Sequence, residues 1–123
     1  MVNLIIPGRL PGLNEYTKAC RTSAYVGAEL KKKSEKLVTN CILAQIQTVR
    51  ISSPVEIRFV WYEKDKRRDP DNISGFGHKV ILDALVKNKI LKDDSQRYVR
   101  RIQDLFETDA VNPRIEVSLQ MIR

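Results

Sequence analysis

Two aspartates separated by a single proline lie in a strongly basic stretch near the middle of the chain. The segment reads Lys66-Arg67-Arg68-Asp69-Pro70-Asp71-Asn72. A residue that precedes proline is kept out of the α region, so Asp69 should be extended, and in extended chain residues two apart point to the same face. We therefore expect Asp69 and Asp71 to lie side by side. Such a pair suits Mg²⁺, which typically takes one or two carboxylates together with water and phosphate oxygens.

Two other interpretations of this acid pair follow from general chemistry. A calcium-binding EF-hand loop counted from Asp69 needs a glycine and a final glutamate where the chain has Ser74 and Val80, so that interpretation fails. An aspartate-rich turn that caps a helix and is held by neighbouring arginines is the ordinary structural role of such a pair, and it stays open.

Further acids follow along the chain. Asp83 comes four residues after Lys79, so the two can pair on one face of a helix, and Asp93-Asp94 follow in a loop that could return toward Asp71. Taken singly, Asp83 indicates an ion pair on a helix face, and Asp93-Asp94 indicate a turn. Together with the first pair they could enclose a metal site for phosphodiester cleavage, in which the metal activates a water and a lysine stabilises the transition state.

Composition limits the classes of function. The chain has 123 residues, enough for one domain over residues 1–123, and its net charge of +7 favours a nucleic-acid partner. A signal peptide and an apolar run of membrane-spanning length are both lacking, which predicts a cytoplasmic chain without a membrane anchor. The two cysteines, Cys20 and Cys41, are far apart and His78 is the single histidine, so a zinc site and Ser-His-Asp chemistry are disfavoured. Glycine neighbours suggest that His78 is an exposed loop residue.

The elements that would position these residues alternate between the apolar spacing of a strand and that of a helix. Strand patterns occupy residues 2–6, 55–61, 98–106 and 115–121, and helical patterns occupy residues 28–49 and about 71–88, the second with Asp71 or Asn72 as its cap. Residues 11–23 are expected to form a loop. The prediction is an α+β fold with a small mixed or antiparallel sheet and two main helices, in the order β-α-β-α-β-β, because the second and last strands alternate apolar with polar residues.

Four segments, taken in order, resemble the RusA family of Holliday junction resolvases. They read Leu10-Pro11-Gly12-Leu13-Asn14-Glu15-Tyr16, Arg68-Asp69-Pro70-Asp71-Asn72-Ile73, Lys79-Val80-Ile81-Leu82-Asp83-Ala84-Leu85 and Ile90-Leu91-Lys92-Asp93-Asp94. The stretch between Asp71 and Lys79 is longer here than in the shortest members of that family.

The resemblance implies a homodimeric endodeoxyribonuclease that depends on Mg²⁺, with Mn²⁺ as a substitute, and that resolves four-way or branched DNA by paired cuts in recombination and repair. Such enzymes are often encoded by prophages. Two cuts at symmetry-related strands are what a C2 pair of identical sites supplies. By position, the resemblance assigns metal binding and catalysis to Asp69, Asp71 and Asp94 and a catalytic role to Lys79. The clustering of acids along the chain makes Asp83 and Asp93 further metal candidates. The residues expected to contact DNA are Asn14, Tyr16, Arg21, Arg67, Arg68 and Asn72.

Two alternatives from other classes remain at this stage. The charge alone is also compatible with a basic nucleic-acid-binding protein without catalytic activity, in which the acids only shape a turn. The same metal chemistry would also serve a nuclease that acts on other branched DNA.

Overall fold

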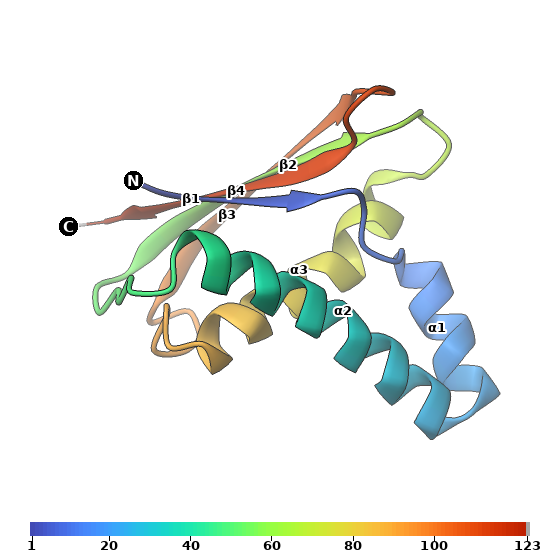
Figure 1. The fold of residues 1–123 in the computed structure, drawn as a ribbon, viewed down its shortest axis with the longest axis horizontal. Helices are drawn as coiled ribbons and strands as arrows, with labels where there is room; N and C mark the ends of the chain where they lie inside the picture. The colour runs from blue at the N-terminus through green and yellow to red at the C-terminus, as the bar shows by residue number, and fades with distance from the viewer. Residues whose placement is uncertain (123) are drawn as a thin grey trace.

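The computed structural model describes residues 1–122, and within them four strands form one sheet with three helices layered on one of its faces (Figure 1). The strands are β1 (Val2–Pro7), β2 (Val55–Glu63), β3 (Val99–Thr108) and β4 (Arg114–Met121). The helices are α1 (Leu13–Thr22), α2 (Ala24–Gln45) and α3 (Pro70–Lys87). The predicted α+β class is therefore confirmed.

The sheet has the strand order β1-β4-β2-β3 and is mixed. Strand β4 is antiparallel to both β1 and β2, whereas β2 and β3 are parallel neighbours. Parallel neighbours need a crossover connection, and α3 supplies it between β2 and β3. As a result, β1 and β3 are the two edge strands.

Alternating apolar residues of the inner strands build the core beneath the helices. In β2 the predicted period of two is confirmed, because Val55, Ile57, Phe59 and Trp61 are all buried. In β4 the buried residues Ile115, Val117 and Leu119 alternate with polar ones. Helix α3 adds an apolar face of its own, which includes Phe76, Val80, Ile81, Ala84 and Leu85. The opposite face of the sheet is left without a helical layer (Figure 1).

The loop expected over residues 11–23 is wrong, because most of it is helix α1. Gly12 is the N-cap residue of α1, and its backbone nitrogen donates a hydrogen bond to Glu15 Oε1 at 3.2 Å. Leu13, Tyr16 and Cys20 do recur at helical spacing, but Pro11, Gly12 and Asn14 at the start of the segment are typical loop residues, and these favoured the loop. The element order is accordingly β-α-α-β-α-β-β, with three helices instead of two.

The two predicted helices exist, but their starts differ from the expectation. Helix α2 begins at Ala24, because the Ser23 hydroxyl accepts a hydrogen bond from the Val26 backbone nitrogen at 3.0 Å and caps it. Helix α3 begins at Pro70 and is capped by Asp69 instead of Asp71 or Asn72. None of the helices in residues 1–122 is both long and apolar enough to cross a membrane.

Candidate functional site

The turn from β2 into α3 positions the first acid pair. Asp69 is extended, with φ −78° and ψ 164°, and its Oδ1 accepts a hydrogen bond from the Asn72 backbone nitrogen at 2.8 Å. Pro70 occupies the first helical position, where its fixed φ is compatible with a helix, so Asp71 already lies in the first turn of α3. The expected extended conformation is thus confirmed for Asp69 and wrong for Asp71. Both side chains are exposed, and Asp69 does serve as a helix cap.

Arg68 anchors this turn to the body of the protein. Its guanidinium donates two hydrogen bonds to the Glu63 carboxylate, at 2.7 and 2.8 Å, and a third to the Leu10 carbonyl oxygen at 3.2 Å. Both charged side chains are only 11% exposed. Arg68 therefore joins the end of β2 to the loop that precedes α1, and three of its five N–H donors are used within the protein.

Asn72 joins the first turns of α3 and α1. Its Oδ1 accepts a hydrogen bond from the Asn14 backbone nitrogen at 2.9 Å. The approach is close, because a Cβ added at Gly12 would lie 2.5 Å from Asn72 Oδ1, so a larger residue at that position would displace the Asn72 side chain. Two helix N-termini thus meet beside Asp69 and Asp71, and the partial positive charge of such termini favours negative groups there.

Tyr16 does not present its ring as a free stacking surface. The centroid of the half-buried Tyr16 ring lies 4.4 Å from that of Phe76, and the angle between the two ring planes is 25°. Interaction of its hydroxyl with the Cys20 thiol, together with burial, raises the pKa of Tyr16. Tyr16 therefore packs α1 against α3.

Asp83 pairs with α2 instead of with Lys79. The Lys31 ammonium donates a hydrogen bond to Asp83 Oδ2 at 2.7 Å, and this bond is the main reason that the pKa of Lys31 is raised. Lys31 also lies 3.6 Å from Glu35, which pairs with Lys87 at 3.0 Å. Asp83 thus belongs to an ion-pair network between the two long helices.

Lys79 is exposed on α3, eight residues after Asp71. At the α-helical rise this separation is about 12 Å along the axis. Within residues 1–122, Lys79 makes no ion pair or side-chain hydrogen bond. Its ammonium is therefore free to meet a phosphate.

The second acid pair lies at the other end of α3. Asp93 and Asp94 are exposed in the loop that leads to β3, beyond the C-terminus of a helix of 18 residues (Figure 1). Such a helix is about 27 Å long. Accordingly, no group of three or more His, Cys, Asp or Glu side chains in residues 1–122 is close enough to hold a metal ion. The loop does not return to Asp71 within one chain.

The remaining predicted DNA contacts are exposed basic residues. Arg67 has a side chain that is 87% exposed and lies 3.6 Å from Asp65, and Arg21 is exposed in the last turn of α1. Asn14 also presents its side chain to solvent beside the acid pair. The structure therefore brings together Asn14, Asn72, Asp69 and Asp71 with Arg67 nearby in sequence, and it separates them from Asp83, Asp93 and Asp94.

One cluster of polar side chains, contributed by β2, α3 and β3, was not predicted from the sequence. Asp104 Oδ1 lies 2.7 Å from His78 Nε2 and accepts a hydrogen bond from Trp61 Nε1 at 2.8 Å. His78 is on α3, partly buried and packed against the Phe59 ring at 4.7 Å, so its assignment to an exposed loop is wrong. The three residues come from three separate elements, and no local pattern could have linked them.

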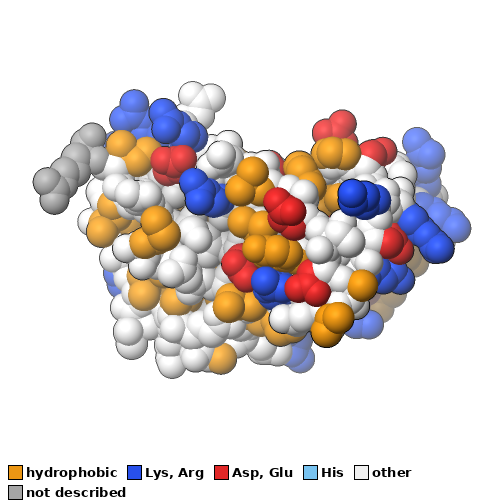
Figure 2. Space-filling model, turned by 90° about the horizontal axis from the view of Figure 1, so that it is seen from above, with side chains coloured by type: hydrophobic (Ala, Val, Ile, Leu, Met, Phe, Trp, Pro, Cys, Tyr) orange, Lys and Arg blue, Asp and Glu red, His pale blue; other side chains and the backbone are white. Residues whose placement is uncertain are grey.

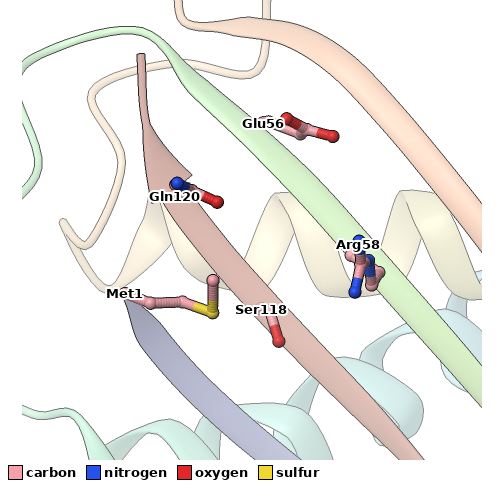
Figure 3. Close-up of a pocket in the computed structure, with 5 residues that line it drawn as sticks. All are labelled: Met1, Glu56, Arg58, Ser118 and Gln120. Atoms are coloured by element: carbon pink, nitrogen blue, oxygen red, sulfur yellow. The ribbon is translucent and has the colours of Figure 1, made fainter. Parts of the chain in front are cut away.

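The open face of the sheet offers no comparable site. Viewed from the sheet side, basic, acidic and hydrophobic side chains are intermixed, without a continuous patch of one sign (Figure 2). A shallow pocket on this face is lined by Met1, Glu56, Arg58, Ser118 and Gln120 (Figure 3). None of the predicted acids contributes to it.

The carboxylates at the start of α3 fit a magnesium ion in type and number. Mg²⁺ is a hard cation that binds through one or two carboxylates and keeps several waters. Asp71 makes no hydrogen bond or ion pair within residues 1–122, and Asp69 uses one oxygen for the cap. The pair therefore leaves carboxylate oxygens for a cation, whereas the larger set that includes Asp94 is not assembled in a single chain.

Comparison with known proteins adds no relative: no family model matches the chain, and no curated protein matches it.

Proposed function

We propose that the chain is a Mg²⁺-dependent, structure-selective endodeoxyribonuclease that resolves four-way DNA junctions, as its resemblance to the RusA family implies. The observation that carries the proposal is the pair of exposed carboxylates, Asp69 and Asp71, held where the N-termini of α1 and α3 meet. Three of the segments that carry the resemblance contribute to this region or to α3, which leads away from it. The net charge of +7 supports a polyanionic substrate.

The residues around the pair have distinct roles in the proposal. Asp71 and the free oxygen of Asp69 hold the cation, while Asn72 and Arg68 keep the turn rigid. Bound Mg²⁺ supplies an activated water and neutralises charge on the phosphate and the leaving oxygen. Arg67 and Lys79 are the exposed cations that contact DNA phosphates and stabilise the charge that develops during cleavage.

A second copy of the chain is needed if Asp94 acts at the same site. The length of α3 separates Asp94 from Asp71 in one chain, so only the partner's Asp94 could approach. The proposed set of metal ligands, with Asp94 included, therefore requires the proposed homodimer. The paired cuts follow from the same symmetry, because a C2 dimer has two such sites.

One finding favours a second candidate, a basic nucleic-acid-binding protein without catalytic activity. Asp69 caps α3 and Arg68 is engaged with Glu63, so part of the motif already has a structural role. In this alternative the acids shape the turn and Arg67 binds the DNA backbone.

Single-turnover cleavage of an end-labelled four-way junction distinguishes the candidates. The wild type is expected to make symmetric nicks with Mg²⁺ and none with EDTA, and Asp71→Asn should bind the junction but fail to cut it. Asp83→Asn is the matched control on the same helix, because Asp83 is held by Lys31, and it should keep cutting. Tight binding without cleavage under any metal would favour the non-catalytic protein, and equal cutting of junctions, flaps and duplex would refute junction selectivity.

A further inference from the structure

A pocket opens beside the turn that carries the first acid pair. It lies between the start of α3 and the end of β3, and its lining includes Pro70, Ile73 and Phe106. Its volume is about 190 Å³, less than the roughly 300–1,000 Å³ of pockets that hold a drug-sized ligand. Pro70 stands between Asp69 and Asp71 in the sequence, so a group that fills the pocket lies next to the proposed cation site.

The apolar part of the lining includes an exposed aromatic ring. Ile73 is buried, whereas Phe106 is 38% exposed. Phe106 is the ladder partner of the buried Trp61, so its ring points to the helical side of the sheet. Two residues earlier, Asp104 bonds to Trp61 and to His78 of α3, which fixes β3 relative to that helix. A ring held in this way is a surface on which a planar group can stack.

The polar part of the lining disfavours an anion but can bond to an uncharged group. Its charged residues are three acids and two bases: Glu63, Asp65, Glu107, Lys66 and Arg68. The resulting negative charge disfavours a phosphate inside the pocket. Two of the five N–H groups of Arg68 have no partner within residues 1–122, and the Glu63 carboxylate can accept further bonds. The pocket therefore suits a flat, uncharged ring that has both donors and acceptors on its edge.

We propose that this pocket holds one unstacked nucleobase of the DNA strand that is cut, with the base stacked on Phe106 and its polar edge bonded to Arg68 and Glu63. Aromatic stacking and hydrogen bonds to the base edge are the means by which proteins hold bases that have left the helix. A base is joined to its own phosphate through a single sugar. A base in the pocket would therefore leave that phosphate outside, beside Asp69 and Asp71. This role rests on the proposed function.

The pocket would give the nuclease its selectivity for branched DNA. In a continuous duplex each base is paired and stacked, and removing a base from the stack costs free energy. The cost is smallest for a base that is already unpaired, and stacking is interrupted where strands branch. A cut that requires one base in the pocket would therefore occur at a branch point and not along the duplex arms.

Binding of a four-way junction by the full chain tests the role of Phe106. Fluorescence anisotropy is measured with Asp71→Asn present in every variant, so that no strand is cut. Phe106→Ala should raise the Kd for the junction about tenfold, because one base loses its stacking partner. Phe106→Leu, which keeps an apolar side chain, should weaken binding similarly, whereas Phe106→Trp should bind like the parent.

Leu105→Ala is the matched control on the same strand. Leu105 is also 38% exposed, but it points to the opposite face of the sheet and does not line the pocket. Its replacement should leave the Kd unchanged. Far-UV circular dichroism verifies that each variant is folded.

Removal of the base itself tests what fills the pocket. A set of junctions carries a single abasic nucleotide, placed in turn at each position around the branch point. At one position the abasic junction should bind the parent about tenfold more weakly. At that position Phe106→Ala should cause no further loss, because both changes remove the same contact, whereas independent contacts give additive losses.

Additive losses at every position would overturn the base-binding role, as would an effect of Phe106→Ala no larger than that of Leu105→Ala. If these losses are additive and the chain with Asp71 intact still cuts junctions, the pocket is refuted and the proposed nuclease stands. Coupled losses in a chain that cuts no DNA would refute the nuclease and leave the pocket. A chain that binds no junction would refute both.

Discussion

Asn72, in the first turn of α3, accepts with its side-chain oxygen a hydrogen bond from the backbone nitrogen of Asn14, in the first turn of α1, at 2.9 Å. The same residue donates its own backbone N–H to Asp69 at 2.8 Å. Asn72 is therefore the point at which the acid pair, the start of α3 and the start of α1 are held together.

Replacing Asn72 should loosen α1 before it affects the rest of the fold. Asn72→Ala removes the acceptor for Asn14, and by analogy with other helix caps it should lower the free energy of unfolding by about 1 kcal/mol. Hydrogen exchange at Asn14 should accelerate. Asn72→Asp keeps the acceptor and should restore protection there. Unchanged exchange in Asn72→Ala would show that the contact does not order α1.

Two adjacent arginines should behave in opposite ways. Arg68→Met leaves Glu63 with an unpaired carboxylate in a site that is 11% exposed, and it should lower the free energy of unfolding by about 3 kcal/mol. Arg67→Met removes only an exposed charge, so the free energy of unfolding should change little. The slope of the logarithm of the DNA-binding constant against the logarithm of the salt concentration should become shallower by about one, which corresponds to the loss of one phosphate contact. Chemical denaturation and binding at several salt concentrations measure both effects. Equal destabilisation by the two substitutions would contradict the assignment.

The Lys31–Asp83 pair should stabilise the packing of α2 on α3. Lys31→Met is expected to lower the free energy of unfolding by about 1 kcal/mol, because the pair is partly exposed. The pKa of Lys31 is raised in the folded state, mainly by its hydrogen bond to Asp83. Its contribution is therefore present at neutral pH and is lost as the pH rises through the raised value.

Denaturation at a series of alkaline pH values measures this contribution. The stability difference between wild type and Lys31→Met should shrink at high pH. Lys33→Met, at an exposed position nearby, is the control and should show no such convergence. A difference that is constant with pH would exclude the ion pair as its cause.

Mixed dimers test whether the two acid pairs act across chains. Asp71→Asn and Asp94→Asn should each be inactive alone. When the two chains are co-expressed, about half of the dimers contain one chain of each kind, and each such dimer has one intact composite site out of two. About a quarter of the wild-type number of sites should therefore be active. The readout is single nicking of a four-way junction by purified mixed dimers carrying two different tags. A site built within one chain would leave every mixed dimer inactive.

Several elements were predictable because their signals are local. The alternation in β2 and β4 reflects one buried face, and the Pro70 motif marks the start of α3. Helix α1 was missed because Pro11, Gly12 and Asn14 are typical loop residues and the helix has only 10 residues, although Leu13, Tyr16 and Cys20 share one of its faces. The roles of Arg68 and Asp83 were equally hidden, because their partners lie in β2 and α2 and a charged side chain in a sequence does not reveal what it will pair with.

The sequence by itself determined the α+β class, the alternating faces of the inner strands and the position of the Asp69-Pro70-Asp71 turn, because each depends on neighbours a few residues apart. Only the tertiary structure decided which charges are free. It engages Arg68 and Asp83 in ion pairs, leaves Asp71 and Lys79 open, and separates Asp71 from Asp94 by the length of α3. Charges find partners through space, and the path of the backbone sets those distances.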